Sequence, residues 1–246
     1  MGNFYDTEKL IYGIIEMGFR CVGSTWADGE YSGRIYMDTR LICFDLDDTL
    51  IRDIHSVMLP CILNGKEKEH AVIQKQEESG LLDYKTADYL RAELLSGLNE
   101  QDIKCHFLEI ARPLENISET IDILHKHGIK CLIITVGPVQ VAGVVSAIYG
   151  FDGFYGSNYE VMNGKFTGKI LTYVEAENKV NCLEDYCRKN NINPSACIAV
   201  GDGSTDIPVF NYCGKSIALN ASDRVKRKAV YSVDSNNLLE ILDYVI

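Results

Sequence analysis

Short apolar runs alternate along this chain with longer helical or turn-rich stretches, and this alternation constrains the fold more than any other feature. The runs cover residues 41–46, 130–136, 196–200, 216–219 and 229–233, and each is too short to form a helix. Strands that alternate with helices predict an α/β fold, in which helices cover both faces of a parallel sheet. Ligands of such sheets bind beyond the carboxyl ends of the strands, so the polar residues that end each run are candidate site residues.

Residues 131–151 contain no charged side chain, and this segment is long enough to be considered as a membrane span. Gly137 and Pro138 interrupt it, however, and proline favours the first turn of a helix. We therefore expect a buried strand over residues 130–136, then a turn, then a helix that begins near Pro138.

Charge and cysteine content limit the partners and the compartment of the protein. Lys and Arg total 24 against 35 Asp and Glu, a formal net charge of −11, which argues against nucleic acid or an anionic membrane as a partner. The nine cysteines are an odd number and include no C-x-x-C pair, so we expect reduced thiols. The acidic N-terminal residues do not resemble a secretory signal, and we expect a cytoplasmic protein.

Three segments depart from the alternation of strands and helices. Residues 53–112 have apolar residues at helical spacing and no convincing strand, which predicts a helical insertion. Residues 159–167 alternate around Asn163 and Gly164, a pair that predicts a small β-hairpin. Residues 1–40 predict one amphipathic helix followed by a glycine-containing stretch. We assign this extension no function: it could pack on the core, add an edge strand or mediate association.

Two of the predicted strands end in carboxylates that could share one cation, namely Asp45, Asp47 and Asp48 after the first strand and Asp202 and Asp206 after the strand at 196–200. Like charges this close raise one another's pKa, and a bound cation is the usual way to keep such a cluster ionised. Because the ligands are oxygen atoms with no His or Cys nearby, they favour Mg²⁺ over Zn²⁺. The alternative is a solvated turn, in which aspartate is common.

Two further residues suit a phosphate group. Thr135 ends the strand at 130–136 and is followed closely by Gly137, while Lys179 lies in a helical stretch. A hydroxyl, a backbone amide and an ammonium can all bind phosphoryl oxygens. Each residue alone is more often structural or solvated, so only the combination indicates a phosphate site.

The order and spacing of these motifs resemble the haloacid dehalogenase-like superfamily and, within it, the phosphoserine phosphatases. The motifs are D-x-D-x-T-L after one strand, Thr at the end of a second, Lys on a helix, and G-D-x-x-x-D at the end of a third. The resemblance covers residues 41–246. It implies a Rossmann-like core, formed by residues 41–52 and 113–246, with a helical C1-type cap inserted at 53–112.

The resemblance also implies a Mg²⁺-dependent phosphomonoesterase that acts on a small phosphorylated metabolite. Asp45 would attack phosphorus to form an aspartyl-phosphate, and Asp47 would act first as general acid and then as general base. Mg²⁺ would be held by Asp45, the backbone carbonyl of Asp47 and Asp202, with Asp206 close behind.

The remaining core motifs would hold the phosphoryl group. Thr135 and the Gly137 amide would bind its oxygens, and Lys179 would pair with both Asp45 and the phosphate. Thr205 takes the place of a common Asn in the same pocket and is a substrate-binding candidate. Asp48 receives no catalytic role.

The cap leaves the substrate open. Arg91 matches the arginine that binds the substrate carboxylate in phosphoserine phosphatases, but Ile54 stands where those enzymes have the acid that binds the ammonium. Val136 replaces a glycine beside the phosphate pocket. Phosphoserine is therefore one candidate among several.

Two other functions fit the same residues. The aspartyl-phosphate could be discharged to an acceptor alcohol, which would make the protein a phosphotransferase, or the chain could be a non-catalytic protein that binds a phosphate ligand. A true dehalogenase is disfavoured because it lacks the second aspartate of D-x-D.

Overall fold

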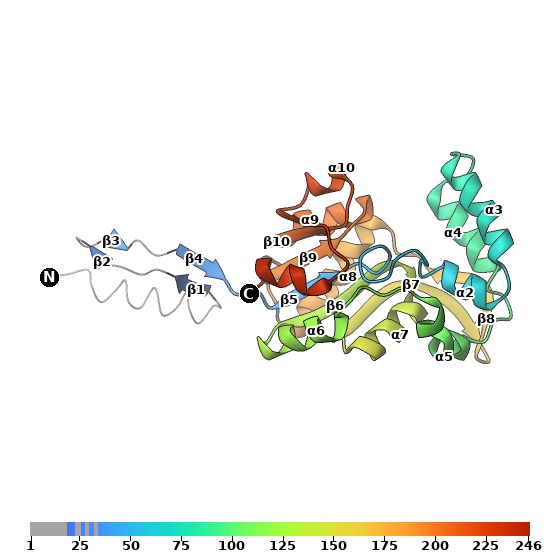
Figure 1. The fold of residues 1–246 in the computed structure, drawn as a ribbon, viewed down its shortest axis with the longest axis horizontal. Coiled ribbons are helices and arrows are strands. Elements are labelled where there is room, and N and C mark those ends of the chain that lie inside the picture. Colours follow the sequence, from blue (N-terminus) through green and yellow to red (C-terminus); the bar gives the residue numbers. More distant parts are fainter. Residues whose placement is uncertain (1–18, 23–25, 28–29, 32–33) are drawn as a thin grey trace.

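A seven-stranded sheet forms the centre of the computed structural model, which describes residues 19–22, 26–27, 30–31 and 34–246 (Figure 1). Its strand order is β11-β10-β9-β5-β6-β7-β8. The strands are β5 (Leu41–Phe44), β6 (Lys130–Pro138), β7 (Gly153–Met162), β8 (Lys165–Thr172), β9 (Cys197–Gly201), β10 (Lys215–Leu219) and β11 (Tyr231–Val233). All neighbours pair in parallel except β7 and β8. Every apolar run of the sequence lies on one of these strands, so the expected α/β class is confirmed.

Helices cover both faces of this sheet: α6 (Ile117–Lys126), α7 (Val139–Tyr149), α8 (Ala176–Asn190), α9 (Ile207–Tyr212) and α10 (Asp223–Lys226). Successive residues of a strand point to opposite faces, and β5 shows the consequence. Ile42 and Phe44 belong to one apolar cluster together with residues of α6 and α7, whereas Leu41 and Cys43 pack with α8 and α9. The sheet therefore separates two cores, which bury all four residues of β5.

The uncharged segment at 131–151 forms strand β6 and helix α7, as expected, but the expected turn between them is absent, because β6 continues to Pro138 and α7 begins at Val139. Pro138 is the residue that precedes the first turn of α7, where its fixed φ fits and no backbone N–H is missing. No helix in the described part of the chain is long and apolar enough to cross a membrane.

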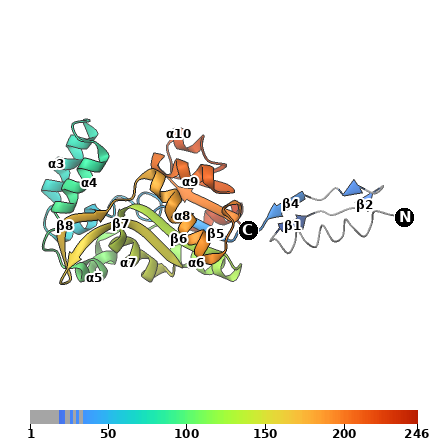
Figure 2. The same cartoon turned by 180° about the vertical axis from the view of Figure 1, so that it is seen from behind.

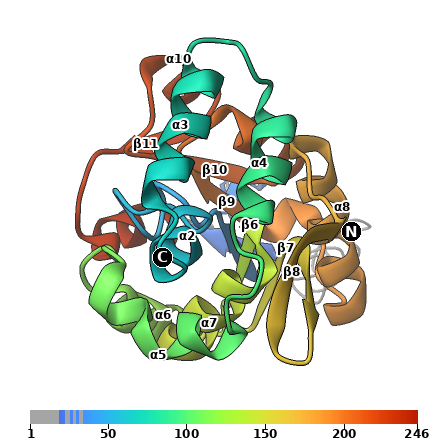
Figure 3. The same ribbon diagram turned by 90° about the vertical axis from the view of Figure 1, so that its right-hand side faces the viewer.

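The helical insertion lies between β5 and β6 and contains α2 (Met58–Leu63), α3 (Glu67–Glu78), α4 (Tyr84–Glu93) and α5 (Glu100–Ile110). Helices α3 and α4 pack against each other and rise above the sheet, while α4 also contacts β8 (Figures 2 and 3). Helix α5 packs on α2 and on α7 of the core. The expected helices are present; the division at residues 53 and 112 into a separate cap domain stays a prediction.

The hairpin centred on Asn163 and Gly164 is larger than expected. Both residues have positive φ angles, 52° and 75°, as a two-residue turn between twisted strands requires. The antiparallel pairing extends to Asn158 and Thr172, so the predicted segment at 159–167 is only the tip of β7 and β8. Because β7 also pairs with β6, the hairpin forms one edge of the main sheet rather than a separate element.

The N-terminal extension contains short antiparallel pairs. Strand β1 (Phe19–Val22) pairs with β4 (Arg34–Met37), and β2 (Trp26–Ala27) pairs with β3 (Glu30–Tyr31). These strands form their own two-stranded sheets and do not join the edge of the main sheet. The predicted amphipathic helix lies outside the described residues.

The hairpin turn gives a direct test of backbone strain. A Cβ at position 164 meets no atom closer than Asn99 Oδ1 at 3.8 Å, so Gly164→Ala adds strain from positive φ and no clash. We expect the free energy of unfolding to fall by about 1–2 kcal/mol. Urea denaturation measures it, with Lys165→Ala on the neighbouring exposed residue as control. An unchanged midpoint for Gly164→Ala would contradict the positive φ.

Candidate active site

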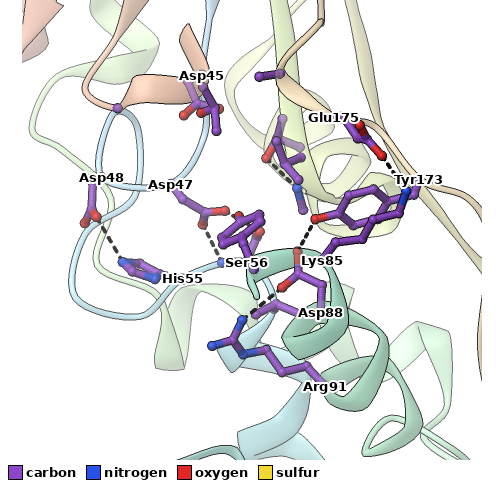
Figure 4. A pocket seen from close by; sticks show the side chains of 18 of the residues that line it. Asp45, Asp47, Asp48, His55, Ser56, Lys85, Asp88, Arg91, Tyr173 and Glu175 are labelled. Carbon is purple, nitrogen blue, oxygen red and sulfur yellow. Dashed lines mark hydrogen bonds and ion pairs between the residues drawn. The ribbon is translucent and has the colours of Figure 1, made fainter. Parts of the chain in front are cut away.

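A pocket of about 630 Å³ lies between the carboxyl ends of the central strands and the helices α3 and α4 (Figure 4). The strand order places the ends of β5, β6 and β9 side by side, and each end contributes polar residues to the pocket floor. Helix α8 contributes Lys179. Helices α3 and α4, here called the cap helices, cover the side of the pocket opposite the strand ends and form its roof. With one exception, the candidate residues of the core motifs line this pocket; they are Asp45, Asp47, Thr135, Gly137, Lys179, Asp202 and Thr205.

The exception is Asp206, which lies behind the floor and shares Lys179 with Asp45. The Lys179 ammonium donates a hydrogen bond of 2.8 Å to Asp45 Oδ1 and another of 2.8 Å to Asp206 Oδ1. Only 1% of Lys179 is exposed. Burial alone would lower the Lys179 pKa, but the charges of Asp206 and Asp45 outweigh it and raise the pKa. Burial and the charge of Asp206 in turn raise the pKa of Asp45 well above its ordinary value.

A glycine makes the position of Asp206 possible. A Cβ at position 201 would lie 2.4 Å from the Asp206 carboxyl carbon, so only glycine fits at the end of β9. The short 3₁₀ turn η2 (Ser204–Asp206) then returns the carboxylate beneath the loop, where Asp206 Oδ2 accepts a 3.0 Å hydrogen bond from the Gly203 amide. Asp202 lies in the same loop and accepts a hydrogen bond from the Thr49 hydroxyl at 3.2 Å.

The carboxylates of Asp45, Asp202 and Asp206 form a cluster that suits a divalent cation. One oxygen atom from each lies within 4.8 Å of the others. Burial and the charge of Asp206 raise the pKa of Asp202 to about 7, which indicates that Lys179 alone does not compensate the cluster. Oxygen-only ligands of this kind favour a hard cation such as Mg²⁺. The side chain of Asp47 is not part of this cluster.

Ser56 instead holds the side chain of Asp47. Its backbone amide donates to Asp47 Oδ1 at 2.5 Å and its hydroxyl donates to Oδ2 at 2.6 Å (Figure 4). Burial raises the pKa of Asp47, and these two hydrogen bonds oppose that rise. A Cβ at position 137 would lie 2.0 Å from the Ser56 hydroxyl, so Gly137 leaves the space that this contact needs. The sequence analysis missed Ser56, because no motif marks a loop serine.

Thr135 and the residues after it form the irregular end of β6, where the pairing register with β7 shifts between Ile134 and Pro138. The Thr135 hydroxyl, almost fully buried, accepts a hydrogen bond of 3.0 Å from the Gly137 amide. The Val136 carbonyl accepts a hydrogen bond of 2.6 Å from the buried hydroxyl of Ser157 on β7. Ser157 also accepts from the amide of Val174 at 2.9 Å. The Val136 side chain is buried, and the hydrogen bond from Ser157 connects the end of β6 to β7.

Arg91 lies in the pocket roof, where its guanidinium already has partners. It donates to Asp88 Oδ1 at 3.0 Å and to Gln74 Oε1 at 2.6 Å, and it forms an ion pair with Glu77. The hydroxyl of Tyr173, just past β8, donates to the other Asp88 oxygen at 2.7 Å (Figure 4). The sequence analysis missed this network, because α3, α4 and the segment after β8 meet only in the folded chain.

In phosphoserine phosphatases the acid that binds the substrate ammonium stands at the position of Ile54. In this chain the loop at residues 53–55 places no carboxylate in the pocket. Ile54 packs against the apolar core, and Asp53 lines a separate hollow next to Arg112. His55 does line the pocket and forms a 3.1 Å ion pair with Asp48. The hydrogen bond to Asp48 raises the His55 pKa to about 9, so this loop contributes a cation.

Removal of the Lys179 charge should destabilise the metal-free protein. Lys179→Met leaves Asp45 and Asp206 buried without a cation, and we expect a loss of about 3–5 kcal/mol near pH 8. A buried carboxyl whose folded pKa lies above its unfolded value stabilises the fold at low pH, and this contribution disappears as the pH rises through the folded pKa.

The loss should therefore be smaller near pH 5, where the Asp45 carboxyl more readily takes up a proton. Denaturation in EDTA at both pH values measures it, with the exposed Lys189→Met as control. An equal loss at both pH values would contradict the charge argument.

Known proteins resemble this chain in sequence over most of its length. A family model described as haloacid dehalogenase-like hydrolase matches residues 42–211. The phosphoserine phosphatase of Idiomarina loihiensis is 33% identical over 204 residues, which are 82% of this chain and 91% of the relative. That of Methanocaldococcus jannaschii is 30% identical over 209 residues, which are 84% of this chain and 97% of the relative.

Solved structures show that the likeness extends to the fold of most of the chain. A structure described as a phospho-aspartyl intermediate analogue of phosphoserine phosphatase superposes with a TM-score of 0.71 at 27% identity, over 85% of this chain and 100% of the other. A substrate-bound phosphoserine phosphatase complex gives a TM-score of 0.71 at 28% identity, over 85% of this chain and 99% of the other. The chain belongs to the haloacid dehalogenase-like hydrolase family.

Proposed function

We propose that this protein is a metal-dependent phosphomonoesterase that hydrolyses a small phosphorylated metabolite through an aspartyl-phosphate on Asp45. The observation that carries the proposal is the pairing of Asp45 with the buried Lys179, next to a second aspartate, Asp47, that is held separately by Ser56. The Lys179 ammonium stabilises the ionised form of Asp45 and opposes the rise in pKa that burial and Asp206 cause, whereas Asp47 is held by the neutral donors of Ser56, has a raised pKa and can carry a proton. A nucleophile and a general acid need these two different states.

In the first step an Asp45 oxygen attacks phosphorus in line with the ester bond. The bond between phosphorus and the alcohol oxygen breaks, and Asp47 gives its proton to the departing alcohol. In the second step Asp47 takes a proton from water, whose oxygen attacks phosphorus. The bond between phosphorus and Asp45 then breaks, which releases phosphate, restores the Asp45 carboxylate and leaves Asp47 protonated for the next cycle.

Lys179, Thr135 and the Gly137 amide favour this reaction because they place positive charge and hydrogen-bond donors beside the phosphoryl oxygens. Without Lys179 an anionic nucleophile would repel an anionic substrate. Asp45, Asp202 and Asp206, with the backbone carbonyl of Asp47, would hold Mg²⁺, which would supply further positive charge against the phosphate.

The relatives named as phosphoserine phosphatases make O-phosphoserine a candidate substrate. Thr205 and Arg91 both line the pocket, and we propose that both face the bound substrate. A small soluble phosphate ester, with no nucleic acid or membrane partner, fits the acidic chain, and we place the protein in the cytoplasm.

The direct test is phosphate release by the wild type and by Asp45→Asn. With Mg²⁺, we expect the wild type to hydrolyse p-nitrophenyl phosphate and the variant to lose at least about a thousandfold in kcat, because an amide is a poor nucleophile. EDTA should abolish activity, and added Mg²⁺ should restore it. Comparable activity of Asp45→Asn would overturn the proposal, and transfer of phosphate to an added alcohol rather than to water would make the enzyme a phosphotransferase.

Ser56 should control the proton affinity of Asp47. Ser56→Ala removes one of two hydrogen bonds that lower the Asp47 pKa, so Asp47 should remain protonated to higher pH. The second step requires the unprotonated form. We therefore expect a roughly tenfold loss of kcat near pH 6 and a smaller loss near pH 8.

The pH profile of kcat measures this effect, with the exposed Ser222→Ala as control. A loss that is the same at every pH would mean that Ser56 only supports the local structure.

A further inference from the structure

We propose that the cap end of the pocket binds an amine and disfavours a carboxylate, so that the substrate is the phosphate ester of an amino alcohol. This inference rests on the proposed phosphomonoesterase function and specifies its substrate class. It concerns the part of the pocket formed by α3, α4 and the segment after β8, which faces the alcohol part of a substrate whose phosphate lies near Asp45.

The charges that line the cap end are acidic in balance. Three carboxylates, those of Glu77, Asp88 and Glu175, face two cations, Lys85 and Arg91. Both cations are already paired within the protein, Lys85 with Glu175 and Arg91 with Glu77 and Asp88. A ligand therefore meets one uncompensated negative charge, which attracts an amine and repels a carboxylate.

Arg91 is poorly placed to offset that charge for an incoming carboxylate. Only 3% of the residue is exposed, and its two terminal nitrogens donate to Asp88, Gln74 and Glu77. Its Nε is buried and makes no hydrogen bond. A substrate carboxylate at this guanidinium would be a third carboxylate beside Glu77 and Asp88, which already outnumber its single positive charge.

The neutral groups at the cap end also suit an amine. His70 is 7% exposed and lines the pocket, and its ring makes no hydrogen bond within the described part of the chain. Burial and the charge of Arg91 lower the His70 pKa to about 4, so the ring is neutral and offers a nitrogen lone pair to an ammonium N–H. A protonated histidine could not accept that hydrogen bond.

Aromatic rings complete this environment. Three tyrosines, Tyr84, Tyr159 and Tyr173, line the pocket. The ring centroid of Tyr173 already lies 5.6 Å from the Lys85 ammonium nitrogen. The faces of tyrosine rings attract cations, most strongly where water is excluded. Burial, followed by the negative charges of Asp88 and Asp47, raises the pKa of Tyr84. This tyrosine therefore lies within the electric field of carboxylates from both ends of the pocket.

The experiment compares kcat/KM for small esters that differ chiefly in their charged groups. O-phosphoethanolamine carries the amine alone, O-phospho-L-serine adds a carboxylate, 2-phosphoglycolate carries only a carboxylate, and glycerol 1-phosphate has neither. We expect O-phosphoethanolamine to exceed each of the others by at least about tenfold, the discrimination that one favourable or unfavourable charged contact provides.

Variants test whether the cap carboxylates cause the preference. Asp88→Asn should lower the ratio of kcat/KM for O-phosphoethanolamine to that for glycerol 1-phosphate by at least about fivefold. Glu77→Gln, at a less buried position, should lower it in the same direction if the Asp88 variant proves unstable on thermal unfolding. Asp122→Asn, an exposed residue of α6 outside the pocket, should leave the ratio unchanged.

The outcomes separate this inference from the proposed function. Preferred hydrolysis of O-phospho-L-serine or 2-phosphoglycolate would overturn the amine inference and leave the phosphomonoesterase intact, as would equal rates for all four esters. A preference for the amine that survives both cap substitutions would overturn the assignment to these carboxylates. If the wild type hydrolyses none of the esters, including p-nitrophenyl phosphate, both proposals fall.

Discussion

The ammonium of Lys179, buried between Asp45 and Asp206, is the interaction on which the site depends. It connects helix α8 on one face of the sheet to the end of β5 and to the turn that follows β9. A buried lysine is costly unless it is paired, and two carboxylates this close are costly without a cation. Neither arrangement is stable without the other, so the phosphate end of the pocket is preorganised before any substrate binds.

The two ends of the pocket differ in electrostatic character. At the strand ends Lys179 supplies positive charge, and a metal at the proposed site of Asp45, Asp202 and Asp206 would add more, which suits a phosphoryl group. Under the cap helices, carboxylates outnumber cations, and the remaining groups are neutral and aromatic. An extended ligand with a negative phosphate and a positive amine matches both ends of the pocket. This match determines the orientation of the ligand, with the phosphate at the strand ends and the amine under the cap helices.

The sequence predicted the strands and the residues at their ends well, because both follow from short-range patterns. A buried parallel strand is a continuous apolar run, and the topology then brings the ends of β5, β6 and β9 together without further information. Asp45, Thr135 and Asp202 therefore lie in one pocket as expected. The hairpin was predicted only at its tip, because the strands continue through pairing with β6 that no local pattern encodes.

The contacts of the cap could not be predicted in the same way. Tyr173 and Asp88 are 85 positions apart and meet only because α4 packs against β8. Ser56 reaches Asp47 across nine positions of loop that have no regular period. The resemblance placed Arg91 in the substrate pocket, but the partners of its guanidinium come from Gln74 and Glu77 on α3 and Asp88 on α4, which only the folded chain brings together.

The phosphate end and the cap end of the pocket differ in how freely their residues can be substituted. The groups that act on phosphorus belong to the sheet and α8, where glycine at position 201 and the Lys179 pairing leave little freedom for substitution. The groups proposed to face the alcohol belong to α3, α4 and the segment after β8, and the hydrogen bonds that Asp88 makes with Arg91 and Tyr173 do not involve Asp45 or Lys179. Charge at the cap end can therefore change without disturbing Asp45 and Lys179. The same reaction can then serve a carboxylate-bearing or an amine-bearing alcohol, according to which cap side chains already neutralise Arg91.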